Sequence, residues 1–132
     1  MKLFALNFIV NMLLIKEICI LFNCQIKDLP KIFRSSANRV KIISNFKGLW
    51  LRTTYKNRSG VYHFFQLDDF SYQDCRHVKA YNNFLGVSVM QHYYVRHRIL
   101  IKHHDLPCVV ERGEKDNIKY YPIELLEIVN TP

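Results

Sequence analysis

The sequence predicts a mainly β protein with some helix (α+β), in which a small, partly open β-barrel carries an inserted helical segment. Short runs of alternating apolar and polar residues recur after residue 48, separated by turn-forming residues, and one run with helical spacing precedes them while a second lies among them. With 132 residues, of which 49% are hydrophobic and 23% charged, the chain is long enough for one domain with its own core. Four glycines and four prolines are too few for a long low-complexity stretch.

The N-terminal run MKLFALNFIVNMLLIKEICILFNC is apolar but discontinuous. Four polar or charged residues interrupt it: Asn7, Asn11, Lys16 and Glu17. It does not reach the roughly eighteen apolar residues of a membrane-spanning helix, and no A-x-A-like cleavage site follows. We therefore expect residues 1–26 to form a buried strand or helix at the entrance of a domain at residues 27–132, with no membrane partner. A signal anchor, based on Lys2 and the early apolar run, is the alternative.

Basic residues are concentrated in one part of the chain, where Asp28 is the single acid. They are Lys27, Lys31, Arg34, Arg39, Lys41, Lys47, Arg52, Lys56 and Arg58. The formal net charge of the whole chain is +8, so the charges of the remaining residues balance. This concentration predicts an anionic partner, with nucleic acid as the first candidate and an anionic membrane as the second. A solvated basic face is the ordinary alternative.

The stretch FRSSANRVKIISNF predicts a short basic helix, in which Ser35 and Ser36 are candidate N-caps. Its apolar residues at spacings of three are Val40, Ile43 and Phe46. We expect these residues to form a buried stripe, with Arg39 and Lys41 on the opposite face.

A β-hairpin is predicted next. Leu49, Leu51 and Thr53 alternate with Trp50, Arg52 and Thr54, which is the pattern of a half-buried strand. KNRSG provides a turn, and VYHFFQL provides the returning strand. The following stretch, DDFSYQDCRH, is polar and is expected to form turns.

A second helix is predicted in VSVMQHYYVRHR, with Ser88 as its N-cap. Its rows are Val89–Tyr93 and Met90–Tyr94–His97, so the two adjacent tyrosines should point to neighbouring faces, one inward and one toward a cleft. ILIKHH, CVVERG and IKYY are then expected as short strands with turns between them.

The cysteines and histidines do not predict a metal site or a cofactor. Cys19, Cys24, Cys75 and Cys108 form no CxxC pair or dense framework, which fits a reducing compartment. His103 and His104 would point to opposite faces of a strand, which makes them a poor pair of zinc ligands.

Other chemically active residue types have ordinary structural interpretations. Cys108 fits a small buried residue better than a nucleophile, because the spacing provides no base directed at it. Glu124 and Glu127 fit a cap or a solvated first turn after Pro122. The sequence therefore does not predict an enzyme.

Five stretches in order resemble the PAZ domain of Argonaute and Piwi proteins: KGLWLRTTY, GVYHFFQL, VSVMQHYY, DLPCVVERG and KYYPIELLEIV. The family has a leucine-proline-cysteine strand and a tyrosine-leucine-proline-leucine-glutamate end at the positions of the last two, which are the most specific. The resemblance covers about Phe46 to Val129, within residues 27–132.

This resemblance implies an OB-like, partly open β-barrel with an inserted αβ module. It also implies a cleft between the two that anchors the 3′ end of a single-stranded or overhanging small RNA, without catalysis, in RNA-mediated gene silencing. Other Argonaute domains or silencing-complex proteins would be further partners. The expected location is the cytoplasm, with the nucleus or ribonucleoprotein granules as alternatives.

The resemblance also implies RNA contacts, residue by residue. Tyr93 matches the tyrosine whose hydroxyl binds the terminal phosphate, and Tyr94 matches its aromatic neighbour. Tyr62 matches a strand tyrosine that also reaches phosphate. Tyr55 occupies a position where Argonautes have a histidine.

Two basic contacts are implied with alternatives. The family's basic residue before the strand tyrosine is replaced by Gly60 or Val61, so Arg58 would reach the cleft from the turn. The second phosphate-binding position on the helix is taken by His97 or Arg98, and either side chain provides a donor.

Lys119 and Tyr121 match positions beside the last nucleotide, with tyrosine replacing the family's usual leucine. An aromatic residue of the inserted module would clamp the bases. Its candidates are Phe70, Tyr72, Tyr81 and Phe84.

Two other functions fit parts of the sequence. The fold could lack RNA-end binding and act as a protein-interaction or regulatory module, as the missing basic residue at Gly60 or Val61 suggests. Alternatively, about the first 22 residues could attach the module to a membrane.

Overall fold

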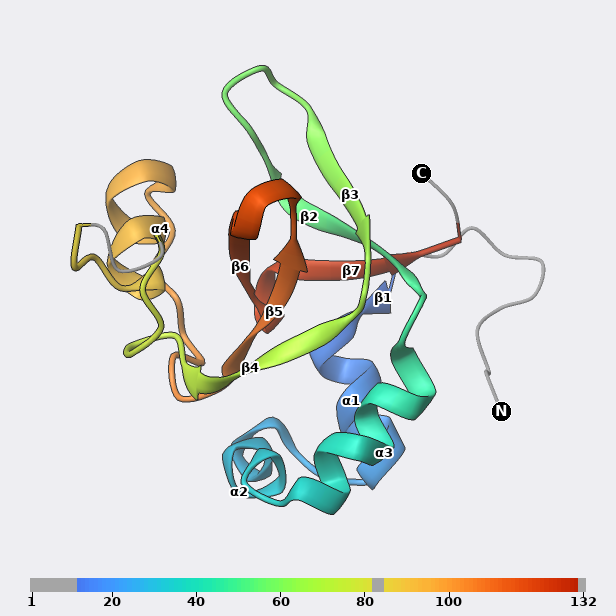
Figure 1. Ribbon diagram of the computed structural model, residues 1–132. Helices are drawn as coiled ribbons and strands as arrows, with labels where there is room; N and C mark the ends of the chain where they lie inside the picture. The colour runs from blue at the N-terminus through green and yellow to red at the C-terminus, as the bar shows by residue number, and fades with distance from the viewer. Residues whose placement is uncertain (1–11, 82–84, 131–132) are drawn as a thin grey trace.

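The computed structural model describes residues 12–81 and 85–130, which form two antiparallel sheets with a layer of helices at one end (Figure 1). The strand order is β1-β7-β2-β3 in the first sheet and β4-β5-β6 in the second. The strands are β1 (Met12–Leu13), β2 (Trp50–Lys56), β3 (Tyr62–Gln66), β4 (Asp69–Asp74), β5 (Pro107–Arg112), β6 (Ile118–Pro122) and β7 (Leu126–Val129). No ladder joins the two sheets within the described residues, so the barrel is partly open, as predicted.

The helical layer precedes β2 and lies away from the β2–β3 turn (Figure 1). It consists of α1 (Leu14–Phe22), the 3-10 turn η1 (Ile26–Asp28), α2 (Leu29–Phe33) and α3 (Ser36–Phe46). Leu14 and Ile18 of α1 share the main core with Leu51 of β2. Of the expected entrance segment at residues 1–26, residues 12–26 are described, and Leu14, Ile15, Ile18 and Cys19 of α1 are buried. Residues 1–11 lie outside the described ranges. None of the described helices is long and apolar enough to span a membrane.

Helix α3 begins where the sequence predicts but turns a different face to the core. The Oγ of Ser35, the N-cap, accepts a hydrogen bond from the backbone N–H of Asn38 at 3.3 Å. The predicted buried row is wrong at Val40, which is 67% exposed, and the fully buried pair is Ile42 and Phe46. Three residues cover less than one helical turn of 3.6 residues. A row of residues spaced by three therefore shifts around the helix and does not stay on the face that packs against the core.

Arg39, predicted on the exposed face of α3, instead connects the helical layer to β4. Its guanidinium donates hydrogen bonds to the backbone carbonyls of Phe33 at 3.4 Å, Phe70 at 3.3 Å and Ser71 at 2.6 Å. Its guanidinium carbon also lies 4.9 Å from the ring centroid of Tyr72. Three backbone acceptors from two elements therefore depend on one side chain.

The β2–β3 hairpin is confirmed. Leu51 pairs with Phe65 across the hairpin, and both are buried in the main core. Thr53 is also buried, as the predicted alternation requires. Gly60 occupies the turn with φ +77°, a conformation that glycine adopts without strain.

The expectation of turns in DDFSYQDCRH is wrong for Asp69–Asp74, which form β4. Asp69 pairs with Val110 and Phe70 pairs with Val109 of β5. Phe70 alone points to the main core, where it is 3% exposed. The polar side chains around it gave the strand a loop-like composition.

The expectation of a strand in ILIKHH is also wrong. This stretch forms no regular element between α4 (Val89–His97) and β5. The carboxylate of Glu124, in the 3-10 turn η3 (Ile123–Leu125), accepts hydrogen bonds from the backbone N–H groups of Lys102 at 3.0 Å and His103 at 2.6 Å. A side chain thus takes the place of a neighbouring strand as hydrogen-bond partner.

The segment between β4 and β5 carries α4 and a second, smaller core. Ser88 is the predicted N-cap, and it forms a capping box with Gln91 through hydrogen bonds of 2.9 and 3.1 Å. Beneath α4 lie the buried side chains of Cys75, Val78, Val89, Tyr93, Ile101 and Cys108. The predicted inserted helical segment is therefore anchored by its own apolar contacts.

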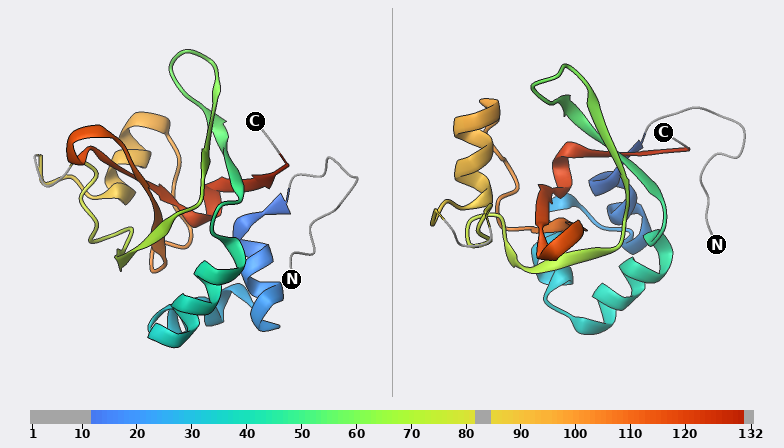
Figure 2. Two further views of the ribbon diagram at one scale, coloured as in Figure 1. Left: turned by 45° about the vertical axis from the view of Figure 1, so that its right-hand side comes forward. Right: turned by 45° about the horizontal axis from the view of Figure 1, so that its top comes forward.

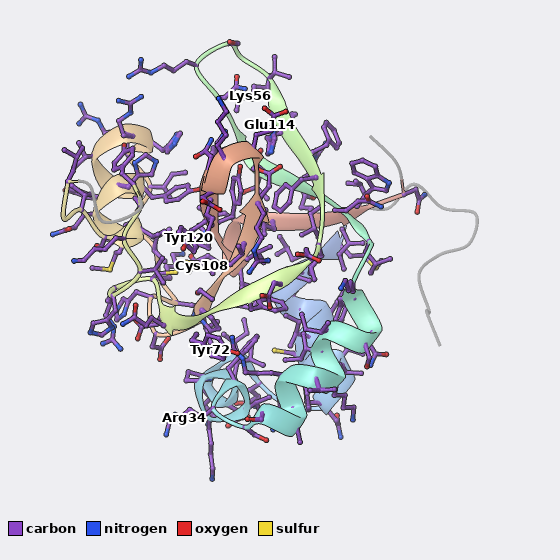
Figure 3. All side chains as sticks on the ribbon, viewed as in Figure 1. Arg34, Lys56, Tyr72, Cys108, Glu114 and Tyr120 are labelled. Atoms are coloured by element: carbon purple, nitrogen blue, oxygen red, sulfur yellow. The ribbon has the colours of Figure 1, made fainter. Side chains whose placement is uncertain are left out.

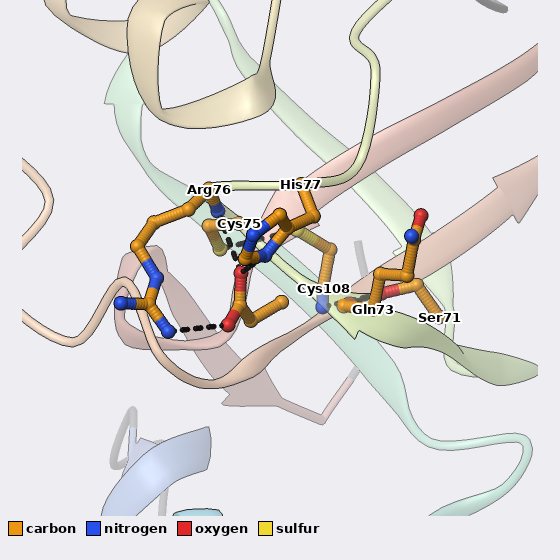
Figure 4. A network of polar contacts seen from close by, with 7 residues as sticks. Ser71, Gln73, Cys75, Arg76, His77 and Cys108 are labelled. Atoms are coloured by element: carbon orange, nitrogen blue, oxygen red, sulfur yellow. Dashed lines mark hydrogen bonds and ion pairs between the residues drawn. The ribbon is translucent and has the colours of Figure 1, made fainter.

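Cys108 is fully buried, as predicted, at the base of this second core. Its backbone N–H donates to Ser71 Oγ at 2.8 Å, and its Sγ lies 3.2 Å from Cys75 Sγ (Figure 4). The hydrogen bond with Cys75 and burial both raise the pKa of the Cys108 thiol. The four cysteines are free thiols. In the described ranges no group of three His, Cys, Asp or Glu residues is placed to hold a metal ion.

We predict that Arg39→Met lowers the free energy of unfolding by roughly 1.5–3 kcal/mol, because backbone acceptors lose charge-assisted hydrogen bonds. Chemical denaturation measures this difference. Arg34→Met, at an exposed arginine five residues earlier, is the matched control and should change the stability by less than about 0.5 kcal/mol. Equal stability of the two variants would contradict the connecting role of Arg39.

Candidate functional site

A cavity of about 910 Å³ lies between the β2–β3 hairpin, α4 and β6, and we call it the α4–β6 cleft. Helix α4 stands beside the β5–β6 pair, away from α1–α3 (Figure 2). The volume falls within the range of about 300–1,000 Å³ that is usual for ligand sites. The lining residues are Thr53, Tyr55, Asn57, Arg58, Ser59, His63, Ala80, Tyr81, His92, Tyr93, Arg96, His97, Asn117, Ile118, Lys119, Tyr120 and Tyr121.

One face of α4 forms a wall of this cleft. Val89 is buried against the second core, and the positions three, four, seven and eight residues later share its side of the helix. These positions are His92, Tyr93, Arg96 and His97, and all four line the cleft.

Tyr93 and Tyr55 meet at the centre of the cleft. Their hydroxyl oxygens are 2.6 Å apart, and their rings meet edge to face with centroids 5.4 Å apart. Burial raises the pKa of Tyr93 well above its usual value and raises the pKa of Tyr55 to about 12. Both hydroxyls therefore keep their protons at neutral pH. The Tyr93 hydroxyl also donates to the carbonyl of Tyr120, but at a long 3.5 Å.

Two imidazoles extend the wall on α4. The His97 ring centroid lies 4.8 Å from that of Tyr55, and His92 Nδ1 lies 2.7 Å from the Tyr81 hydroxyl. Burial is the main cause that lowers the pKa of both histidines, and the nearby charge of Arg96 lowers both further. An anion in the cleft would act in the opposite direction and favour the charged imidazolium.

Strands β5 and β6 provide the opposite wall. The Tyr121 ring stacks on Phe65 and His63, with centroid distances of 4.7 and 5.8 Å. Glu111 accepts hydrogen bonds from the Tyr121 hydroxyl at 2.9 Å and from His63 Nε2 at 2.9 Å. Because a carboxylate only accepts, the His63 proton in this contact lies on Nε2. Burial, and then the charge of Glu111, raises the pKa of Tyr121.

The charge of the cleft is positive. Arg58, Arg96 and Lys119 line it, and the described lining residues include no aspartate or glutamate. Hydroxyls, imidazoles and fixed cations thus converge on one space, which is the donor set that a phosphate group requires.

No protein-family model matches the chain, and no curated protein matches it. Among solved structures, the chain is similar to the PAZ domain of Drosophila Argonaute 2. That structure is described as showing how the domain recognises the 3′ end of nucleic acids. The sequence identity is 16%, the match covers 90% of this chain and 94% of that chain, and the TM-score is 0.65. The chain has a PAZ-like fold.

The PAZ-like fold confirms the OB-like barrel with an inserted αβ module that the sequence resemblance implied. The insertion is the segment between β4 and β5, and it contributes α4 to the cleft. The cleft therefore lies between barrel and insertion, as the resemblance led us to expect.

The structure brings together most of the residues for which the resemblance implied RNA contacts. Six of them line the cleft: Tyr55, Arg58, Tyr93, His97, Lys119 and Tyr121. Three do not: Tyr62, Tyr94 and Arg98.

Tyr62 faces the other side of its sheet. Neighbouring side chains alternate along a strand, so His63, which lines the cleft, excludes Tyr62 from it. The Tyr62 ring instead packs against Arg52 and Lys56, at 4.6 Å from the guanidinium carbon and 5.3 Å from Nζ.

Tyr94 and Arg98 lie outside the cleft for helical reasons. Tyr94 is 61% exposed, one position from the face that Tyr93 occupies, so it points to solvent and does not line the cleft. Arg98 is the C-cap, with a left-handed φ of 57°, and leaves the helical row. Of the pair His97 and Arg98, the cleft contains only His97.

The four candidates for the aromatic clamp have different environments. Tyr81 lines the cleft and contacts His92. Phe70 is buried in the main core, and Tyr72 is 92% exposed next to Arg39. Phe84 lies outside the described residues.

The basic stretch does not gather at the cleft. Of its nine members, Arg58 alone is among the lining residues. Arg34 is the C-cap of α2, so it lies in the helical layer, away from α4 and the cleft (Figure 3). Arg52 forms a 2.7 Å ion pair with Glu127, so part of the positive charge is already neutralised. The nine residues occupy different elements, and the cleft takes only Arg58 from them.

The sequence interpretation missed His63, His92 and Arg96. His92 and Arg96 lie on the same helical face as Val89 and Tyr93, so helical spacing counted from Val89 indicates both. His63 follows from alternation with buried Phe65, two positions later on β3. Helical and strand periodicity indicate all three residues, but the rows predicted for α4 were built on its aromatic residues.

We predict that His92 and His97 titrate below the ordinary imidazole pKa of about 6.5 and that Arg96→Gln raises both values, because a nearby positive charge is removed. NMR titration of the imidazole signals measures this. Arg98→Gln, which removes the same charge outside the cleft, should leave both closer to wild type. Identical titration curves for wild type and Arg96→Gln would contradict the assigned geometry.

Proposed function

We propose that this chain binds the 3′ end of a single-stranded or overhanging RNA in the α4–β6 cleft and has no catalytic activity of its own. The composition of the cleft carries the proposal: hydroxyls, imidazoles and three fixed cations converge, without a carboxylate among the described lining residues. The likeness to a PAZ domain described as recognising 3′ ends of nucleic acids supports it.

The terminal phosphodiester would bind at the tyrosine pair. The hydroxyls of Tyr93 and Tyr55 lie together and carry their protons, and the His97 ring adjoins both. Arg58 and Arg96 add positive charge from the turn and from α4. Charge-assisted hydrogen bonds to phosphate are roughly twice as strong as neutral ones, so these groups favour a phosphate over a neutral ligand.

The last bases would stack on the aromatic walls. Tyr121 lies in the cleft with Lys119 on the same strand, and Tyr81 provides a ring from the inserted segment. Stacking of a base on an aromatic side chain contributes about 1–3 kcal/mol and depends little on sequence. We therefore expect recognition of an end rather than of a base sequence.

We also propose that the module serves RNA-mediated gene silencing in the cytoplasm, next to other Argonaute domains or silencing-complex proteins. The ordered motifs from KGLWLRTTY to KYYPIELLEIV support this context.

A protein-interaction role is the second candidate, because α4 exposes apolar side chains on its outer side. Tyr94 is 61% exposed, Val95 is 68% exposed, and Leu100, just beyond the helix, is 67% exposed. A module of this kind would not distinguish free from blocked RNA ends.

The proposed function predicts that the protein binds a short single-stranded RNA with a free 3′ end at least about tenfold more tightly than the same RNA with a bulky 3′ blocking group. The reason is that the proposed site holds the 3′ end itself, so a bulky group on that end would have to occupy the same space in the cleft. Fluorescence anisotropy with 5′-labelled RNAs measures both affinities. Equal affinities would overturn end binding and favour the protein-interaction role.

Tyr93→Phe should weaken binding of the free-ended RNA by about 5- to 100-fold, because one charge-assisted hydrogen bond is lost while the ring keeps its packing. Tyr94→Phe removes the same hydroxyl from the neighbouring exposed residue and is the matched control, with affinity expected near wild type. If the two variants bind alike, the phosphate contact of Tyr93 is wrong.

A further inference from the structure

Three residues of the basic stretch, Lys27, Lys31 and Arg34, form a row on the outer side of the helical layer, outside the α4–β6 cleft. They lie four and three positions apart in the helical run of η1 and α2, and all three are exposed. Leu29 and Phe33, the buried residues of α2, lie on the opposite side of the same run. The apolar packing of α2 therefore directs the three charges into solvent together.

These three charges are not used in ion pairs within the described part of the chain. None of them has a carboxylate within 4.0 Å there. The neighbouring Asp28 instead accepts a hydrogen bond from the backbone N–H of Gln25 at 3.0 Å. At 1.5 Å per residue the row extends for about 10 Å along the helix axis, which is long enough to face more than one phosphate of a nucleic-acid strand.

An exposed aromatic ring lies near the end of this row. Tyr72 of β4 is 92% exposed, and the guanidinium carbon of Arg39 lies 4.9 Å from its ring centroid. Arg39 also donates a hydrogen bond to the carbonyl of Phe33, the residue before Arg34, at 3.4 Å. Tyr72 and Arg34 thus lie at the same, helical end of the molecule (Figure 3). The cation covers one face of the tyrosine ring and leaves the other face to solvent.

The same ring borders a hollow with room for a base. Tyr72 and Gln73 line a groove of about 430 Å³ beside β4, β5 and β6, and Lys79 adds a positive charge to it. Among the described lining residues Asp69 is the only acid, and it is paired with Arg112 at 3.3 Å. The amide of Gln73 provides both donors and an acceptor for the edge of a base.

We propose that Lys27, Lys31, Arg34 and Tyr72 form a second binding surface, the α2–Tyr72 surface, which holds a single-stranded nucleic acid without using its 3′ end. Cations that follow the backbone, next to an aromatic ring on which a base stacks, are the combination with which proteins bind single strands independently of sequence. A lipid surface fits less well. Helices that bind membranes insert large apolar side chains, and none of those in Ile26–Phe33 is exposed.

The test uses the full chain and a circular single-stranded RNA, which has no end for the α4–β6 cleft to hold. Fluorescence anisotropy over a series of salt concentrations gives its affinity for wild type and two variants. One is Tyr72→Ala, and the other is the triple variant Lys27→Gln/Lys31→Gln/Arg34→Gln.

Each variant has a matched control. Tyr94→Ala removes another exposed tyrosine and is compared with Tyr72→Ala. Arg98→Gln/Lys102→Gln/Lys115→Gln removes three exposed charges from other parts of the chain and is compared with the triple variant.

Tyr72→Ala should weaken binding of the circular RNA by about 5- to 100-fold, as expected for the loss of one base stacked on an aromatic ring. The triple variant should lower the slope of log affinity against log salt by roughly 1–2, because each phosphate contact with a single strand contributes about 0.7. Both controls should stay within about threefold of wild type at 0.15 M salt, where charges farther from the ligand than about 8 Å are screened.

Two results would overturn the inference directly: no binding of the circular RNA by wild type, or wild-type affinity and salt slope in the two surface variants. A third is a triple variant that keeps the circular RNA but no longer sediments with vesicles of equal parts phosphatidylcholine and phosphatidylserine. That result would assign the surface to a membrane.

The α2–Tyr72 surface does not depend on end binding in the α4–β6 cleft. Equal affinities for the free-ended and blocked linear RNAs would overturn the proposed function and leave the result with the circular RNA unchanged. Failure of the proposed function and failure of this inference can therefore be told apart.

Discussion

The contact between Tyr93 and Tyr55 is the interaction on which the cleft depends. Tyr93 belongs to the small core beneath α4, and Tyr55 belongs to β2, so a hydroxyl contact of 2.6 Å joins the inserted segment to the barrel. A buried hydroxyl left unpaired would cost about 1–3 kcal/mol, which favours the two walls staying together. One of the two hydroxyl protons is used in this contact, so the pair keeps one proton that a ligand could accept. One interaction therefore joins the two walls of the cleft and places a donor between them.

The cations that line the cleft differ from several others on the described surface. Arg52 is paired with Glu127, and Arg112 is paired with Asp68 and Asp69. By contrast, the three fixed cations that line the cleft have no carboxylate within 4.0 Å among the described residues. Such cations lose no existing ion pair when an anion binds, so the cleft favours phosphate more than the total charge of the chain suggests.

The sequence predictions were right where an element depends on interactions between residues close together in the sequence. The caps at Ser35 and Ser88 were predictable, because each bonds to a backbone N–H three residues later. Strand β4 was not, because its partner β5 follows more than thirty residues later and a single apolar residue, Phe70, marks its core face. ILIKHH has the composition of a strand, but its backbone donors are satisfied by the distant Glu124. Six of the nine predicted contact residues line the cleft. The direction of neighbouring side chains along β3 and α4 explains why Tyr62, Tyr94 and Arg98 do not.

The sequence by itself determined helices α3 and α4, the β2–β3 hairpin and, through its ordered motifs, the PAZ-like fold, because caps, turns and apolar periodicity act within a few residues. Only the tertiary structure decided which side chains share the cleft. On β3 a shift of one residue exchanges Tyr62 for His63, since neighbouring side chains point to opposite faces, and the register follows from pairing with β2. Likewise, Glu111 meets His63 across 48 residues of sequence, so its place beside the cleft depends on how the hairpin packs against the β5–β6 pair.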